Sequence, residues 1–164
     1  MRDGFSFFCR YRYFCSMTKQ EFDSKLEHLI REALAEDIGE GDHSTLCCIP
    51  QEKTGTAVVK IKQEGILAGL GVAEKVFSFL EPGSVCSMHK QDGDTMEPGE
   101  TAFEVKAHIH TILQGERLVL NCMQRMSGIA TLTRRFAEKL DGYHTKILDT
   151  RKTTPNFRLL EKEA

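Results

Sequence analysis

Two adjacent cations near the end of the sequence have the residue types best suited to binding chemistry. Arg151 and Lys152 lie within residues 147–155, which read ILDTRKTTP, directly after a predicted short strand. Arginine offers a planar fork of donors that matches a carboxylate, whereas lysine offers a compact positive charge. Thr150 adds a hydroxyl group to the same loop. These types fit an anionic small molecule, although spacing alone also allows an ordinary solvated loop.

Arg117 is the second candidate. It belongs to residues 114–121, QGERLVLN, and a further block, QRMSGIAT, follows at 124–131. Both blocks have helical periodicity, and Arg117 lies beside an apolar patch, so it could bind a ligand at an interface. An intrahelical ion pair is the alternative that the spacing leaves open.

The acidic segment 33–45, ALAEDIGEGDHST, ends a predicted helix in a polar turn. Asp37, Asp42 and His43 match no spacing of metal ligands, so we interpret the segment as helix-capping. His108 and His110 are two residues apart with no further ligand nearby, and we expect surface or capping roles for them.

The elements that position these residues follow from the apolar periodicity, which predicts an α+β fold. The long helix contains Gly115 and Gly128, which predict a close backbone approach or a break. Thr154 and Pro155 are typical of an N-cap followed by the first residue of a helix. The predicted helices span residues 18–36, 69–80 and 110–140, with a last one from 155, and the predicted strands span 56–61, 65–68, 84–89, 101–108 and 146–149.

Four segments are predicted along the chain. Residues 1–16 form an atypical aromatic, basic leader that we expect to be disordered, and Met17 is a plausible start. A small α+β domain follows over 17–109, and a long helical segment over 110–145 links it to the last part. Residues 146–164 have the pattern of the first strand and helix of a parallel sheet. Because parallel strands need crossovers of about a dozen or more residues, we expect the second domain to be truncated.

Composition excludes several classes of protein. The 164 residues carry a formal net charge of −2, so the basic excess of a nucleic-acid-coating protein is missing. No apolar run approaches the ~18 residues needed to cross a bilayer. The six cysteines include no C-x-x-C pair, which indicates reduced thiols and a cytoplasmic protein.

Residues 93–107, GDTMEPGETAFEVKA, resemble the strand-turn-strand of biotinyl and lipoyl carrier domains. Those domains carry their modified lysine in a Met-Lys-Met hairpin tip. Here the nearest lysine is Lys106, which lies inside a predicted strand. A carrier module is therefore an alternative that lacks its attachment motif.

Three blocks in order, AEDIGEGD, then ERLVLN with SGIAT, then LDTRKTTP, resemble the quinolinate phosphoribosyltransferases. The resemblance covers about residues 18–164. It implies an N-terminal α/β-hammerhead domain before an incomplete, TIM-like α/β barrel, and a head-to-tail homodimer. It also implies conversion of quinolinate and phosphoribosyl pyrophosphate, with Mg²⁺, to nicotinate mononucleotide, CO₂ and pyrophosphate in NAD biosynthesis.

The resemblance also assigns roles to residues. Arg151 and Lys152 would bind the quinolinate carboxylates, Thr150 would complete their loop, and Arg117 would reach into the partner's site. The family's later barrel strands, which carry further cations and the metal-handling acids, are not in this sequence. We therefore expect negligible turnover from these residues alone. A paralogue associated with molybdenum transport and a non-catalytic interaction subunit are the remaining alternatives.

Overall fold

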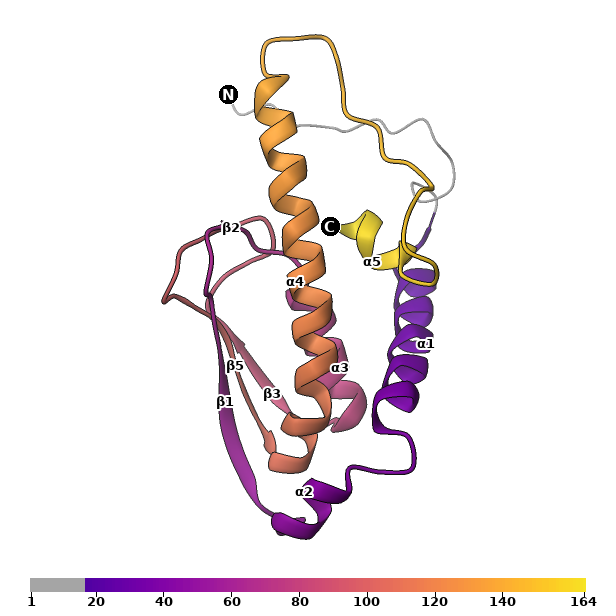
Figure 1. Cartoon of the computed structure of the whole chain (residues 1–164), viewed down its shortest axis with the longest axis vertical. Coiled ribbons are helices and arrows are strands. Elements are labelled where there is room, and N and C mark those ends of the chain that lie inside the picture. The colour runs from indigo at the N-terminus through magenta and orange to yellow at the C-terminus, as the bar shows by residue number, and fades with distance from the viewer. Residues whose placement is uncertain (1–16) are drawn as a thin grey trace.

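The computed structural model describes residues 17–164, so the expected disorder of residues 1–16 lies outside the described part (Figure 1). Helices and strands alternate along the chain, which confirms a mixed helix and sheet protein. The helices are α1 (Lys19–Ile38), α2 (His43–Cys48), α3 (Leu70–Leu80), α4 (Ile109–Lys139) and α5 (Arg158–Glu163). The strands are β1 (Thr54–Lys60), β2 (Gly65–Ile66), β3 (Val85–Met88), β4 (Thr95–Met96) and β5 (Thr101–His108).

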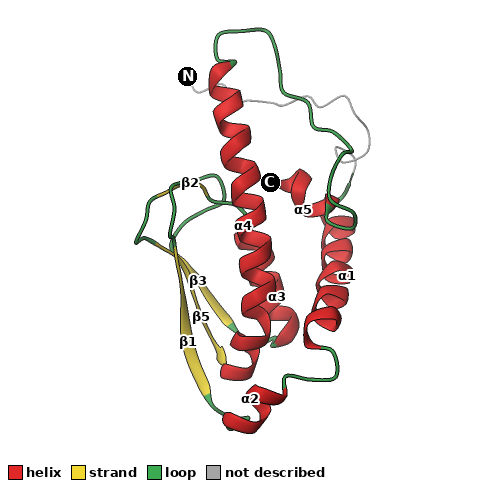
Figure 2. Cartoon of the chain, viewed as in Figure 1, coloured by secondary structure: helices red, strands yellow, loops and turns green. Residues whose placement is uncertain are grey.

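The main sheet is antiparallel, with β5 between β1 and β3, and β2 pairs with β4 in a second small ladder. Helices α3 and α4 lie along one face of the main sheet (Figure 2). Phe103 of β5 is fully buried there and meets Phe77 of α3 edge-on, with 6.3 Å between the ring centroids. The apolar core is therefore the layer between this sheet face and the helices.

Helix α4 is the longest element, about 46 Å at 1.5 Å per residue. It is continuous, so neither glycine breaks it. Gly115 confirms the predicted close approach, because a Cβ there would lie 2.9 Å from Cε1 of Phe77. Gly128 does not, since a Cβ there would meet nothing within 4 Å.

The SGIAT block ties α4 to the short strand β2. The Ser127 hydroxyl accepts a hydrogen bond from the Ala68 N–H at 3.0 Å and lies 3.3 Å from the Ala68 carbonyl. The Thr131 hydroxyl accepts from the Ile66 N–H at 2.8 Å. Gly65 permits this contact, because a Cβ there would lie 2.6 Å from Oγ1 of Thr131. Two hydroxyls thus satisfy backbone groups of Ile66, in β2, and of Ala68, two residues beyond it.

The acidic turn between α1 and α2 contains the predicted cap. Asp42 is the N-cap of α2, and its Oδ1 accepts from the Thr45 N–H at 3.1 Å. His110, at the start of α4, lies with its Nε2 2.9 Å from the Ile49 carbonyl oxygen. The interpretation of this turn as helix-capping is confirmed for Asp42.

Two predictions near the C-terminal end are wrong. Residues 144–150 belong to no helix or strand, whereas 146–149 was predicted as a strand. A strand is stable only beside a neighbour, and no other strand of the described residues runs along this segment. The last helix begins at Arg158 rather than Pro155, because Asn156 adopts a left-handed φ of 63° that a helix cannot include.

The described helices include none long and apolar enough to span a membrane. The described cysteines Cys47, Cys48, Cys86 and Cys122 are free thiols.

Candidate functional site

The loop that carries the predicted anion-binding residues is held from two sides. Oγ1 of Thr150 accepts a hydrogen bond from the Lys152 N–H at 2.8 Å, which closes a tight turn. The guanidinium of Arg158, in α5, donates to Oγ1 of Thr153 at 3.0 Å and to the Arg151 carbonyl at 3.2 Å. The side chains of Thr150, Arg151 and Lys152 are exposed on this ordered backbone.

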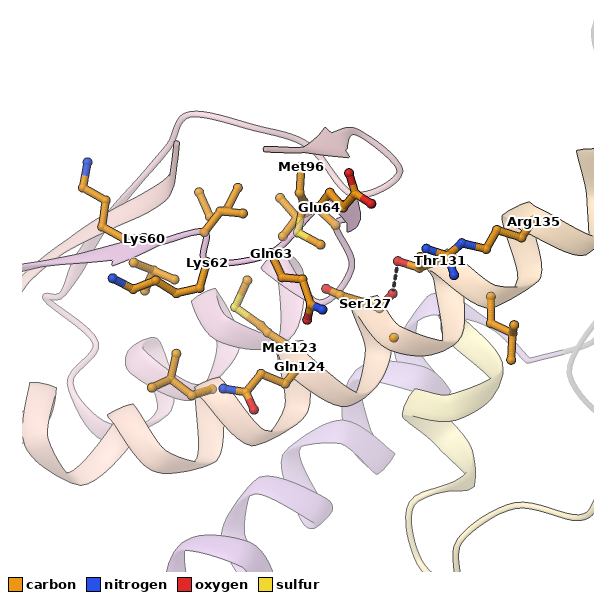
Figure 3. Close-up of a pocket in the computed structure, with 17 residues that line it drawn as sticks. Lys60, Lys62, Gln63, Glu64, Met96, Met123, Gln124, Ser127, Thr131 and Arg135 are labelled. Carbon is orange, nitrogen blue, oxygen red and sulfur yellow. Dashed lines mark hydrogen bonds between the residues drawn. The ribbon is translucent and has the colours of Figure 1, made fainter. Parts of the chain in front are cut away.

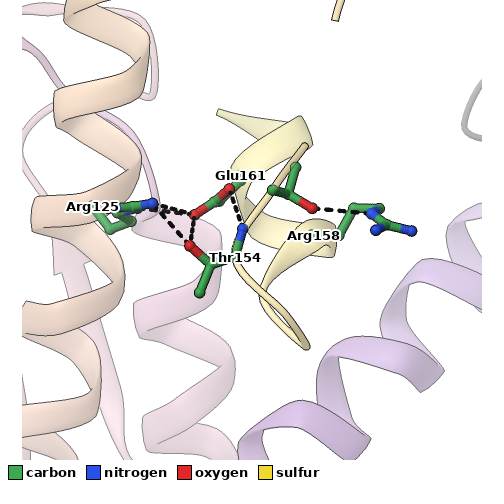
Figure 4. A network of polar contacts seen from close by, with 5 residues as sticks. Arg125, Thr154, Arg158 and Glu161 are labelled. Carbon is green, nitrogen blue, oxygen red and sulfur yellow. Dashed lines mark hydrogen bonds and ion pairs between the residues drawn. The ribbon is translucent and has the colours of Figure 1, made fainter. Parts of the chain in front are cut away.

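A second network joins the same loop to α4 (Figure 4). The Arg125 guanidinium donates to Oε1 of Glu161 at 2.6 and 2.9 Å and to Oγ1 of Thr154 at 2.9 Å. The Thr154 N–H donates to the other Glu161 oxygen at 3.1 Å. Burial raises the pKa of the Glu161 carboxyl, but hydrogen bonds from Thr154 and Arg125 outweigh it and lower the pKa overall.

The charges around the loop favour an anion. Arg151, Lys152 and Arg158 lie within eight positions of one another and carry three positive charges. The nearby acid, Asp149, is engaged in an ion pair with Nζ of Lys162. The loop therefore combines cationic side chains with two carboxylates, Asp149 and Glu161, that are each ion-paired, an arrangement that suits an organic acid or phosphate.

Arg117 lies on α4, and its Nη1 donates to Oδ1 of Asp37 in the last turn of α1 at 2.7 Å. The alternative of an intrahelical ion pair is therefore wrong, because this contact joins two helices. Asp37 is not a capping residue, because the C-cap of α1 is Gly39, whose N–H bonds to the Ala35 carbonyl. The sequence blocks AEDIGEGD, which contains Asp37, and ERLVLN, which contains Arg117, thus meet at one point on the surface.

Within one copy, the structure does not bring all four predicted site residues together. Residues 150–152 form one group, near the beginning of α1 and beside α5 (Figure 1). Arg117 lies at the opposite end of α1, where it contacts Asp37. A 20-residue helix is about 30 Å long, so α1 itself separates the two.

Sequence reasoning did not single out a groove of about 570 Å³ between α4 and the segment joining β1 to β2 (Figure 3). Gln63, from the segment between the strands, and Gln124, from α4, both line it, and Arg135 lies at one end. Ser127 and Thr131 of its wall already bond the β2 segment. Its lining also includes three cations, Lys60, Lys62 and Arg135. We place the candidate site at the 150–152 loop because the predicted anion-binding motif lies there.

A metal centre does not form among residues 17–164, since no three His, Cys, Asp or Glu side chains gather there. The described residues of the loop thus offer donors for anions.

The comparisons with known proteins agree with each other. The family model for the N-terminal domain of quinolinate phosphoribosyl transferase matches residues 42–127, and that for its C-terminal domain matches 129–164. A probable carboxylating nicotinate-nucleotide pyrophosphorylase of Bacillus subtilis is 44% identical over 140 residues, covering 85% of this chain and 48% of that protein. The chloroplastic carboxylating nicotinate-nucleotide pyrophosphorylase of Arabidopsis thaliana is 39% identical, covering 85% and 40%.

Solved structures show the same relationship. NadC from Streptococcus pyogenes superposes with a TM-score of 0.80 at 34% identity, covering 90% of this chain and 51% of that one. The nicotinate-nucleotide pyrophosphorylase from Francisella tularensis gives 0.78 at 35% identity, covering 86% and 50%. The chain spans about half the length of the relatives it matches. Because the first family model alone matches more than half of its residues, the chain belongs to the quinolinate phosphoribosyl transferase family.

Proposed function

We propose that this chain supplies the quinolinate-binding part of a carboxylating nicotinate-nucleotide pyrophosphorylase. That enzyme joins quinolinate to phosphoribosyl pyrophosphate and yields nicotinate mononucleotide, CO₂ and pyrophosphate in NAD biosynthesis. Family membership supports the reaction, and the ordered cationic loop at residues 150–152 supports the binding role. The loop is the single observation that carries the proposal.

The substrate's charges match this loop. Quinolinate carries carboxylates on two adjacent ring carbons and is a dianion at neutral pH. The Arg151 guanidinium can hold one carboxylate through two parallel hydrogen bonds, and the Lys152 ammonium can neutralise the other. Thr150 fixes the turn that carries Arg151 and Lys152, since its hydroxyl accepts a hydrogen bond from the Lys152 N–H. Two different cations on one rigid turn therefore suit a dicarboxylate better than a monocarboxylate.

The chemistry uses these residues for orientation. The pyridine nitrogen attacks C1 of the ribose, and pyrophosphate leaves with the electron pair of the broken C–O bond. The 2-carboxylate then departs as CO₂, and its electron pair stays on the ring carbon next to the positively charged nitrogen until a proton replaces it. Cations that hold the dicarboxylate in place align the nitrogen with the ribose before the reaction.

A second copy of the chain would complete the site. Arg117 and the 150–152 loop lie at opposite ends of α1, so one copy cannot present both to a single small substrate. A head-to-tail homodimer would place Arg117 of one subunit beside the loop of the other. Such an interface repeats the contact by two-fold symmetry, and each dimer would have two equivalent sites.

Several finer features belong to the same proposal. The three-stranded sheet covered by helices supports an α/β-hammerhead domain, and the second family match over 129–164 supports the beginning of an incomplete α/β barrel. The free cysteines support a cytoplasmic location. Mg²⁺ would accompany phosphoribosyl pyrophosphate, whose phosphate oxygens would supply part of its coordination.

A mixing experiment tests the shared site. We define the extended chain as this sequence followed by the part of the Bacillus subtilis relative that lies beyond the matched region. Released ¹⁴CO₂ from carboxyl-labelled quinolinate should depend on phosphoribosyl pyrophosphate, and the 164-residue chain alone should release almost none. Arg117→Ala and Lys152→Ala should each abolish release by the extended chain.

Mixing the two inactive variants should then restore about a quarter of the normal rate, because half of the dimers are mixed and one of their two sites is intact. No recovery despite mixed dimers, seen by native mass spectrometry, would contradict a shared site. Lys146→Ala, an exposed lysine in the same segment, is the control and should leave the rate unchanged.

A further inference from the structure

Asp37 forms an ion pair with Arg117, the side chain that each subunit of the proposed dimer would present to its partner. Oδ1 of Asp37 accepts from Nη1 of Arg117 at 2.7 Å, and the two residues are 80 positions apart in the sequence. The Arg117 side chain is 72% exposed, whereas that of Asp37 is 30% exposed. The carboxylate is thus the better fixed of the two groups, and the guanidinium projects from it into solvent.

The position of Asp37 is unfavourable for its own helix. It lies in the last turn of α1, where the carbonyl ends of the helix carry a partial negative charge. That turn contains no basic residue to compensate. Asp37 also does not cap the helix, because Gly39 does. Glu36 shares this turn, so what distinguishes Asp37 is its contact with Arg117.

The geometry of the contact leaves Arg117 able to bind a second anion. A guanidinium has five N–H donors in one plane, and the contact with Asp37 engages a single terminal nitrogen. Within residues 17–164, the recorded hydrogen bond of this side chain goes to Asp37. The plane of the group is therefore set from one edge, while donors on its other edge can meet a carboxylate.

We infer that Asp37 is a positioning residue that orients Arg117 toward the quinolinate held by the partner subunit. This inference rests on the proposed function of Arg117. An arginine ordered before the substrate arrives loses less conformational freedom on binding. Asp37 also repels the dianion, and the proposal is that the ordering of Arg117 outweighs this repulsion and strengthens substrate binding.

The predicted signature is a change in KM without a change in kcat. Orientation of a binding group stabilises the bound substrate and the transition state alike, so its loss weakens binding only. For the extended chain, Asp37→Asn should raise the KM for quinolinate about 10-fold and leave kcat within about 2-fold. The KM for phosphoribosyl pyrophosphate should not change. Glu36→Gln, an exposed neighbour on α1, is the matched control and should behave as the unmodified protein.

The same Asp37 substitution made in an Arg117→Lys protein separates positioning of Arg117 from a general structural effect. For this comparison Arg117 is replaced by lysine, which retains a positive charge but not the planar fork and should keep measurable turnover. In the Arg117→Lys protein, Asp37→Asn should have a much smaller effect on the KM for quinolinate than in the unmodified protein. Asp37→Glu, which keeps the charge, should stay within about 3-fold of the normal KM.

The results test two claims separately: the substrate-binding role of Arg117 and the positioning role of Asp37. If Arg117→Lys leaves the quinolinate KM unchanged and Arg117→Ala keeps the normal rate, the proposed role of Arg117 fails and the inference fails with it. If those variants weaken binding but Asp37→Asn does not, the inference alone is overturned. It is also overturned if Asp37→Asn acts equally in both backgrounds or lowers kcat instead. Thermal unfolding of the 164-residue variants should show equal midpoints, so that a KM change cannot be attributed to misfolding.

Discussion

Nη2 of Arg125 lies 2.6 Å from Oε1 of Glu161, so the long helix α4 directly holds the last helix of the chain. The same guanidinium reaches Thr154, which belongs to the loop that carries the proposed substrate-binding cations. Helix α4 also carries Arg117, eight residues before Arg125, and bonds the β2 segment through Ser127 and Thr131. One rigid element therefore sets the positions of both groups that a subunit would contribute to the dimer, Arg117 to one site and the 150–152 loop to the other.

Arg125→Ala tests this connection. The Glu161 side chain is only 8% exposed, so removing its partner leaves a nearly buried carboxylate short of hydrogen bonds. We expect the free energy of unfolding to fall by about 1–3 kcal/mol, measured by urea denaturation at pH 7. Arg134→Ala, an exposed arginine on the same helix, should change it by less than about 0.5 kcal/mol. Equal effects of the two substitutions would contradict the proposed connection.

The lowered pKa of Glu161 predicts a dependence of stability on pH. Burial raises this pKa, but the hydrogen bonds from Thr154 and Arg125 reverse the shift, so the folded protein binds this proton less readily than the unfolded chain. The carboxylate therefore stabilises the fold above its ordinary pKa of about 4.3, and this contribution is lost as pH falls through the lower, folded value. Urea midpoints between pH 6 and pH 3 should fall less steeply for Glu161→Gln than for the unmodified chain. Parallel curves would contradict the assignment.

The two glycines of α4 provide a matched pair. A Cβ at Gly115 would lie 2.9 Å from Cε1 of Phe77, so Gly115→Ala overpacks the contact between α3 and α4. We expect a loss of about 1–3 kcal/mol in the free energy of unfolding, reduced in part by the better helix propensity of alanine. Gly128→Ala meets nothing within 4 Å and should stabilise the protein by about 0.5–1 kcal/mol. Thermal or urea unfolding of both variants distinguishes these signs.

The ion pair between Asp37 and Arg117 should contribute little to stability. Both side chains are partly solvated, and such pairs are worth about 0.2–1 kcal/mol at moderate salt. A double-mutant cycle with Asp37→Ala and Arg117→Ala should therefore give a coupling below about 1 kcal/mol in the free energy of unfolding. A larger coupling would indicate that the pair serves the fold, and would weaken the case for a role in binding.

Periodicity predicted the elements that have strong local signals. Helices α1 and α3, the alternating strand β1, the strand β5 and the long helix α4 were all predicted to within a few residues. The cap at Asp42 was predicted because its side chain needs only neighbours in sequence. The predicted strand at 146–149 failed because a strand depends on a partner that local sequence does not specify. Asn156 likewise ended the N-terminal extension of α5 through a backbone conformation that composition does not reveal.

The candidate site was predictable in its residue types and not in its supports. Thr150, Arg151 and Lys152 are adjacent in sequence, so their grouping follows from the motif. Arg125 and Glu161 are 36 residues apart and Asp37 and Arg117 are 80 apart, and only the fold brings each pair together. One signal was present for Asp37, which is an acid in the last turn of a helix, where a base is favoured.

Calorimetric titration of the extended chain with quinolinate tests the central claim most directly, because it measures affinity without turnover. Arg151→Ala combined with Lys152→Ala removes both proposed carboxylate contacts, and hydrogen bonds to charged groups contribute about 1.5–3 kcal/mol each. We therefore expect Kd for quinolinate to rise about 100-fold or more, and Lys146→Ala to leave it unchanged. A Kd within about 2-fold of the unmodified value in the double variant, with the protein still folded, would contradict quinolinate binding by this loop.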